Sequence, residues 1–99
     1  MARLNGSEIK QLLDALDGWS LSSDGKGIEK TFAFKDFNAA FGFMSRVALK
    51  AEQMNHHPEW FNVYRRVEVR LSTHDADGVT ERDAQLATFM DDVAKSSHG

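Results

Sequence analysis

Apolar residues recur at helical spacing in three stretches of the chain. In the first stretch, four residues have the spacing of one face of an amphipathic helix: Ile9, Leu12, Leu13 and Leu16. Asn5 precedes them and Glu8 follows it by three positions, a pair that is typical of a capping box. Gly18 supplies a C-terminal stop. The pattern predicts a short helix that begins after Asn5 and covers a sheet.

Residues 37–54 show the longest helical pattern, and Asp36 is suited to cap its first turn. Seven apolar residues form one stripe: Phe37, Ala40, Phe41, Met44, Val47, Ala48 and Ala51. Three more lie off that stripe: Phe43, Leu49 and Met54. A helix packed on one sheet buries one face. A second apolar face therefore indicates either a second partner, with self-association favoured, or a few apolar side chains exposed to water.

A third helix is expected after Thr80, where Asp83 follows three positions later in a pattern that resembles another capping box. Its apolar face is predicted to consist of four residues: Leu86, Phe89, Met90 and Val93. Residues 96–99 are expected to form a frayed tail in which His98 is inert.

Alternating apolar and polar residues predict four strands in two hairpins. Residues 19–21 and 28–34 flank a turn with an Asp-Gly pair, which favours a hairpin because glycine tolerates positive φ. Residues 60–63 and 67–72 form the second hairpin. The predicted fold class is α+β, a four-stranded antiparallel sheet with three helices packed on one face, in the order α-β-β-α-β-β-α. We expect one domain over residues 1–99.

Composition narrows the class of protein. The 99-residue chain has a net charge of −3 and no run of Lys or Arg, which argues against general nucleic-acid binding. It has no cysteine, so disulfides and thiolate chemistry are excluded. No segment approaches the roughly 20 apolar residues of a membrane span, and the N-terminal residues are polar rather than those of a signal peptide. We expect a cytoplasmic domain without direct contact to nucleic acid or membrane.

Candidate chemistry gathers around two adjacent histidines, His56 and His57, at the end of the long helical pattern. Pro58 ends that pattern, and Trp60 offers a flat face on which a planar ring can stack. Glu52 is placed one helical turn before His56, so the two side chains are expected to be neighbours. If both histidines occupy the last turn, the negative end of the helix dipole favours the protonated imidazolium.

Further titratable residues follow later in the chain. His74 ends the last predicted strand, Asp75 comes next, and Asp83 lies in the first turn of the last helix, where it can orient an imidazole or cap its own helix. Imidazoles exchange protons near neutral pH, so these residues are candidates for acid–base catalysis. Two alternatives stay open at this point. The histidines can be ordinary surface residues, or they can bind zinc, although no His-x-x-x-His spacing is present.

The candidate residues occur at these spacings: Glu52-x3-His56-His57-Pro58-x5-Tyr64-x9-His74-x8-Asp83. This spacing resembles the signature of the pterin-4a-carbinolamine dehydratases. The likeness covers roughly residues 5–94. Within it, five stretches resemble the animal proteins closely: residues 34–38, 41–44, 46–49, 56–64 and 71–74.

The resemblance implies a lyase that removes water from a 4a-hydroxytetrahydropterin and gives the quinonoid dihydropterin. It implies that His56 and His74 act as acid and base at the hydroxyl and at N5, without a metal or an organic cofactor. His57 is implied to lie against the pterin, for orientation and proton transfer. Glu52 is implied to tune His56.

The resemblance also implies which residues surround the substrate. Pro58 and Trp60 are expected to line the pocket, and Thr73 with Asp75 to border the pterin ring. Asp83 is carried over as a supporting residue.

The family further implies partners. The resemblance implies homodimers that are joined at their sheet edges. It also implies that two such dimers pack their long helices together to form a homotetramer. The reaction serves cofactor recycling for a pterin-dependent aromatic amino-acid hydroxylase. In animals a family member also binds a homeodomain transcription factor, so a coactivator is the alternative function. Retention of all three histidines favours the enzyme.

Overall fold

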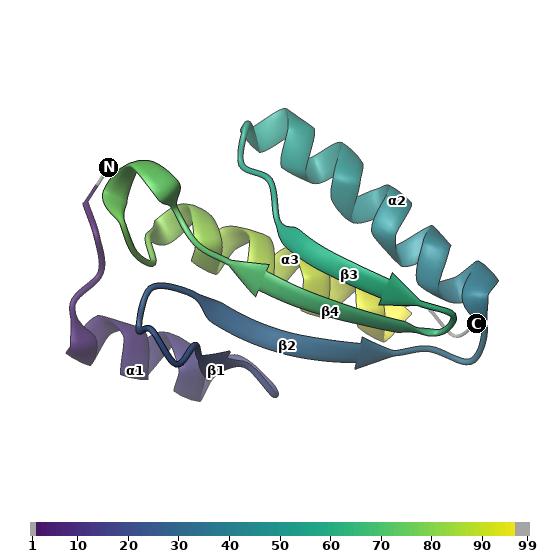
Figure 1. Ribbon diagram of the computed structural model, residues 1–99, viewed down its shortest axis with the longest axis horizontal. Coiled ribbons are helices and arrows are strands. Elements are labelled where there is room, and N and C mark those ends of the chain that lie inside the picture. Colours follow the sequence, from purple (N-terminus) through teal and green to yellow (C-terminus); the bar gives the residue numbers. More distant parts are fainter. Residues whose placement is uncertain (1, 97–99) are drawn as a thin grey trace.

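A computed structural model describes residues 2–96 of the chain, and the tail residue His98 therefore lies outside the described residues. The helices are α1 (Gly6–Ala15), α2 (Phe37–Met54) and α3 (Glu81–Ser96), with a short 3₁₀ turn η1 (His74–Ala76). The strands are β1 (Ser20–Leu21), β2 (Ile28–Ala33), β3 (Glu59–Val63) and β4 (Arg66–Leu71). They form one antiparallel sheet in the order β1-β2-β4-β3, with the helices behind it in the view of Figure 1. The predicted fold class is confirmed.

The helices begin where their capping residues predict. The Asn5 side chain accepts from the backbone N–H of Glu8 while the Glu8 carboxylate accepts from the N–H of Asn5, each at 2.8 Å, so both halves of the capping box form. Asp36 caps α2 by accepting from the N–H of Ala39 at 2.8 Å. Such caps satisfy backbone donors that have no partner within the helix.

The core lies between the sheet and the helices. Alternate residues of the two central strands are buried there: Ile28, Phe32, Val67, Val69 and Leu71. Trp19 and Phe32 pack edge to face, with ring centroids 5.9 Å apart. Among residues 2–96, no helix is long and apolar enough to cross a membrane.

The buried face of α2 differs from the predicted stripe. The helix buries Ala40, Phe43, Val47 and Ala51, whose spacing follows one face. Phe43, which lies off the predicted stripe, is completely buried and contacts the rings of Phe32 and Phe34. Two residues of the predicted stripe, Phe37 and Phe41, are instead 48% and 57% exposed. Because α2 is apolar on two sides, spacing alone does not decide which side meets the sheet.

A partly buried ion pair ties α3 to the sheet. The Lys30 ammonium group lies 2.9 Å from Asp91 Oδ1, and the same oxygen accepts from Trp19 Nε1 at 3.0 Å. The pair joins residues that are 61 positions apart, so no local pattern predicts it.

The fold brings three chain segments to one end of the molecule. The C-terminal end of α2, the C-terminal end of β4 with η1, and the N-terminal end of α3 all lie at the left of Figure 1. The predicted site residues come from these three segments and from the start of β3.

Candidate active site

The two adjacent histidines lie beyond the end of α2, and their predicted place in its last turn is wrong. The helix ends at Met54, and Asn55 follows in a left-handed conformation with a φ of 53°. Asparagine tolerates this conformation better than most residues. The N–H of His56 then donates to the carbonyl of Ala51 at 3.0 Å. This turn directs the chain away from the helix axis and sends His56 toward α3.

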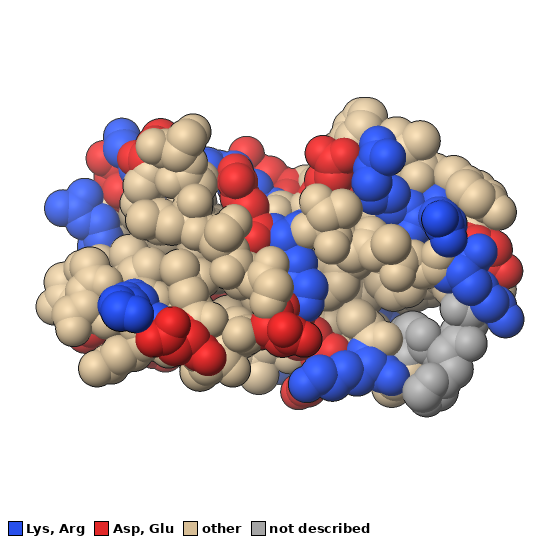
Figure 2. All heavy atoms as spheres, turned by 90° about the horizontal axis from the view of Figure 1, so that it is seen from below, with Lys and Arg blue, Asp and Glu red and all other residues tan. Residues whose placement is uncertain are grey.

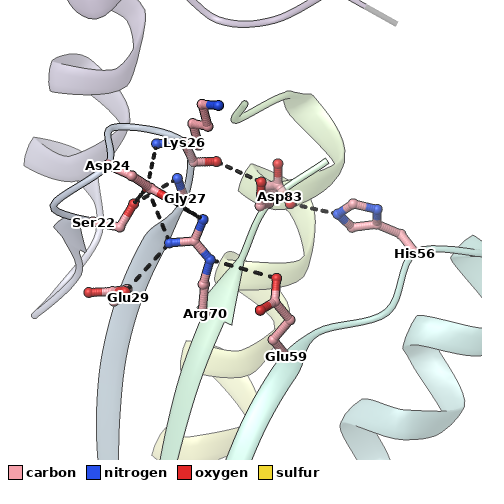
Figure 3. Close-up of polar contacts among 10 residues, drawn as sticks. Ser22, Asp24, Lys26, Gly27, Glu29, His56, Glu59, Arg70 and Asp83 are labelled. Carbon is pink, nitrogen blue, oxygen red and sulfur yellow. Dashed lines mark hydrogen bonds and ion pairs between the residues drawn. The ribbon is translucent and has the colours of Figure 1, made fainter. Parts of the chain in front are cut away.

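His56 and Asp83 form a buried pair. His56 Nε2 lies 2.6 Å from Asp83 Oδ1, and the two side chains are 8% and 0% exposed. The other carboxylate oxygen of Asp83 accepts from Thr73 Oγ1 at 2.8 Å and from the backbone N–H of Thr80 at 2.9 Å. Asp83 therefore caps its own helix and orients an imidazole at the same time. Figure 3 shows the His56 ring pointing at this carboxylate.

The geometry decides which nitrogen of His56 is available for chemistry. A carboxylate accepts hydrogen bonds, so Nε2 carries a proton and is committed to Asp83. Within residues 2–96, no side-chain nitrogen or oxygen is both buried and without a hydrogen-bond partner. Nδ1 has no hydrogen-bond partner among the described residues, so it is not fully buried. It is therefore the nitrogen that His56 can offer to a bound molecule.

Glu52 contacts His57 instead of the predicted His56. His57 Nε2 lies 2.8 Å from Glu52 Oε1, and both side chains are largely exposed, at 57% and 80%. The prediction assumed that the helix continues to His56, whereas the turn at Asn55 rotates His56 inward and leaves His57 over the last helical turn. Glu52 therefore orients the exposed histidine.

His74 lies at the site because the residue before it, Thr73, is bonded to Asp83. Thr73 donates to Asp83, so the next residue, His74, begins η1 beside the buried pair. The side chains of His74 and Asp75 are exposed. In the described part of the chain, no hydrogen bond joins His74 to His56 or His57. The three imidazoles thus share one end of the molecule, with His56 buried and the other two open to water.

The remaining predicted residues have mixed surroundings. Pro58 is half-buried, and Trp60 is half-buried against the core. Thr80 was not predicted as a site residue, yet its hydroxyl lies 2.6 Å from that of Thr73 and completes the network around Asp83. The only local signal for it is the Thr80-x2-Asp83 capping pattern. That pattern indicates a helix start but not the histidine that the cap would hold.

No group of three or more His, Cys, Asp or Glu side chains is placed to hold a metal ion anywhere in residues 2–96. The zinc alternative therefore has no ligand cluster among the described residues. Proton transfer by imidazole is the chemistry that this arrangement offers.

Two hollows are lined by residues other than histidine. One, of about 550 Å³, lies on the open face of the sheet, which we define by the residues Glu29, Thr31, Glu59, Phe61, Glu68 and Arg70. The other, of about 450 Å³, lies between α2 and α3 and includes Lys50 and Phe89. Seen from the edge that carries α1 and β2, the molecule is notched along its top, and charged side chains lie around the notch (Figure 2). Neither hollow is lined by a histidine, so the candidate acid–base residues lie outside both.

The fold and the site together define a small α+β protein with three histidines gathered at one end, and comparison with known proteins gives its family. The family model described as pterin 4 alpha carbinolamine dehydratase matches residues 2–93. The chain therefore belongs to the pterin-4-alpha-carbinolamine dehydratase family.

Individual relatives cover nearly the whole chain. A protein of Burkholderia multivorans, provisionally named a pterin-4-alpha-carbinolamine dehydratase, is 59% identical over 92 residues, which are 93% of this chain and 90% of the relative. A protein of Burkholderia pseudomallei with the same name is 56% identical over 94% of this chain and 92% of the relative. The crystal structure of a transcriptional coactivator/pterin dehydratase from Brucella melitensis is similar, with a TM-score of 0.92 and 51% identity. That match covers 93% of this chain and 98% of that one.

Proposed function

We propose that this protein dehydrates a 4a-hydroxytetrahydropterin to the quinonoid dihydropterin. The C4a–O bond breaks, the hydroxyl leaves as water after it gains a proton, and the N5–H bond gives up its proton as the N5–C4a double bond forms. One proton is gained and one is lost, so the reaction needs two proton transfers and no redox partner. Imidazole is suited to both transfers near neutral pH.

The buried His56–Asp83 pair is the observation that supports this proposal most strongly. A carboxylate behind an imidazole fixes its tautomer and stabilises the positive charge that appears when the other nitrogen takes up a proton. In this arrangement Nδ1 is the nitrogen that His56 can offer to a bound molecule. We assign one proton transfer to His56 and the other to His74, which follows Thr73 in the same network.

The exposed residues complete the proposed site. His57, held by Glu52, would lie against the pterin and orient it. Pro58, Trp60 and Asp75 would border the pterin ring. Thr73 would face the substrate and would also donate a hydrogen bond to Asp83. No cofactor is needed for this chemistry. The cellular role we propose is recycling of the tetrahydropterin used by an aromatic amino-acid hydroxylase, in the cytoplasm.

The direct test is an absorbance assay of synthetic 4a-hydroxytetrahydropterin, which also loses water without a catalyst. We expect the purified protein to accelerate the loss of substrate in proportion to its concentration. The matched control is the Gln11→Ala variant, because Gln11 is an exposed residue on α1, outside the site. An uncatalysed rate in the presence of the wild-type protein would overturn the proposal.

A second candidate function rests on the outer face of α2. Phe37 and Phe41 stack with ring centroids 5.9 Å apart, and Leu49 is 75% exposed on the same helix. An exposed apolar surface of this kind marks interaction sites on many proteins. We propose that it supports a homotetramer built from homodimers or, alternatively, a coactivator contact with a DNA-binding protein.

Light scattering after size exclusion tests the assembly. We expect the wild-type protein to be larger than a monomer and Phe41→Glu to be smaller than the wild type. A monomeric wild-type protein would exclude the homo-oligomer. Co-purification with a DNA-binding protein that Phe41→Glu abolishes would support the coactivator role.

A further inference from the structure

The loop between β1 and β2, residues 22–27, is organised around one carboxylate. Asp24 Oδ1 accepts from Ser22 Oγ at 2.6 Å and from the backbone N–H of Lys26 at 2.9 Å. Ser22 Oγ also accepts from the N–H of Gly27 at 2.9 Å, and the N–H of Ser22 donates to the Gly27 carbonyl at 2.8 Å. The hydrogen bonds close the loop on itself, so it behaves as a rigid piece.

An ion pair fastens this loop to β4. Arg70 Nη2 lies 3.0 Å from Asp24 Oδ2, and the two residues are 46 positions apart (Figure 3). The hydrogen bond from Ser22, with those from Lys26 and Arg70, holds the pKa of the Asp24 carboxyl well below its usual range. The hydrogen bond to Asp24 in turn raises the pKa of Arg70. The pair therefore stays charged at every pH at which the enzyme would be assayed.

The loop backbone also packs closely on the end of β4. A Cβ atom on Gly27 would lie 2.9 Å from Arg70 Cζ and 3.0 Å from the carbonyl oxygen of Leu71, distances at which something must move. Only glycine fits this position without displacing the ion pair or the strand.

Loop 22–27 also contacts the chain before and after the turn that carries His74. The carbonyl of Lys26 accepts from Ser72 Oγ at 2.6 Å, two residues before His74. The ammonium group of Lys26 lies 3.2 Å from Asp77 Oδ1, three residues after it. The turn itself is closed by hydrogen bonds between Thr73 and Gly78 and between Asp77 and His74.

The position of the His74 side chain depends on these contacts of loop 22–27, because the side chain has no hydrogen-bond or ion-pair partner of its own among the described residues. In the described residues the imidazole of His74 makes no hydrogen bond or ion pair, so its position follows the backbone of residues 73–78. We infer that the Asp24–Arg70 pair is a positioning device for His74: it fixes loop 22–27, which holds the turn on both sides. The inference rests on the proposed function, in which His74 transfers a proton.

A set of double variants separates this role from general stability. Asp24→Asn removes the charge that holds Arg70, and we expect kcat to fall on the order of 10-fold because a small displacement of a catalytic group is costly. In a His74→Ala background the same change should have no further effect on kcat. In a His57→Ala background it should again cost on the order of 10-fold.

The matched control is Glu29→Gln. Glu29 Oε2 also lies near Arg70, at 3.6 Å, but among the described residues its side chain makes no hydrogen bond or ion pair with loop 22–27. We expect its kcat to equal that of the wild type. Arg70→Lys keeps the charge with fewer donors, and a loss of a few-fold is expected there. An equal loss for Asp24→Asn with and without the His74 imidazole would overturn the inference.

Amide hydrogen exchange gives a readout that does not need activity. In Asp24→Asn, the N–H groups of Thr73, Asp77 and Gly78 should exchange several-fold faster than in Glu29→Gln, while that of Val69 in the sheet stays unchanged. Unchanged exchange in the turn would refute the positioning role. If the wild-type protein proves inactive but the exchange result holds, the proposed function fails and the positioning role stands.

Discussion

The candidate site has two halves that differ in burial. His56 and Asp83 are buried, with a contact of 2.6 Å that leaves the other nitrogen of the imidazole available to a bound molecule. His57 and Glu52 are exposed, and His74 is exposed without a side-chain partner in the described structure. In the buried half, packing and hydrogen bonds set the position of the ring. In the exposed half, the Glu52 carboxylate sets the position of the His57 ring, and the backbone alone sets the position of the His74 ring.

This difference predicts how each half responds to substitution. Removing a partner from the buried half leaves polar groups unsatisfied, so stability and activity should fall together. Removing a group from the exposed half leaves water to replace it, so activity should change while stability changes little. Substitutions in each half test this contrast.

The largest effect is expected for His56→Ala. The variant loses a proton-transfer group, and general acid–base catalysis contributes about 100-fold to 10,000-fold. We expect kcat in the dehydration assay to fall at least about 100-fold. His57→Ala is the matched comparison, because it removes the neighbouring imidazole from the exposed half. A loss for His57→Ala that exceeds the loss for His56→Ala would reverse the proposed division of roles.

Asp83→Ala should show the largest loss of stability. The substitution leaves His56, Thr73 and the N–H of Thr80 without their acceptor inside the protein. Each buried donor that is left unsatisfied costs about 1–3 kcal/mol. Urea unfolding followed by circular dichroism measures this cost. A change below about 1 kcal/mol would show that the buried half is not held as we describe.

Glu52→Gln should have a small effect on stability. The Glu52–His57 pair is exposed, and such pairs contribute about 0.2–1 kcal/mol. We expect unfolding in urea to shift by no more than this, while KM for the pterin rises a few-fold because His57 is less well oriented. A loss of stability equal to that of Asp83→Ala would remove the distinction between the halves.

The smallest expected effect is on the stability of the fold at low pH. Because the folded pKa of Asp24 is lowered, its contribution to stability is present above the unfolded value, about 3.9, and is lost as the pH falls toward the folded value. The wild-type protein should therefore lose more stability than Asp24→Asn between about pH 4 and pH 2. Circular dichroism in an acid titration measures this difference. Parallel acid titrations of the two proteins would contradict it.

The sequence predicts the elements of this fold well because their signals are local. Asn5 with Glu8, and Asp36, mark helix starts within three residues, and the structure shows the predicted caps. The strands follow from alternation, which needs only neighbouring residues.

The features that the sequence did not predict depend on contacts between distant segments. The turn at Asn55 brings Glu52 to His57 rather than to the expected His56, and Asp83, the partner of His56, lies 27 positions away from it. The burial of Phe43 rather than Phe41 depends on where the sheet meets α2. The Asp24–Arg70 pair joins residues on opposite sides of α2 in the sequence. The resemblance identified the candidate residues, but it did not give these contacts.

We propose that two imidazoles at one end of the sheet dehydrate the pterin. The most direct measurement compares the loss of synthetic 4a-hydroxytetrahydropterin with wild-type protein, with the double variant His56→Ala/His74→Ala, and without protein. We predict that the wild-type protein accelerates dehydration and that the double variant matches the uncatalysed rate. A double variant as fast as the wild type, or a wild-type protein no faster than buffer, would contradict the claim.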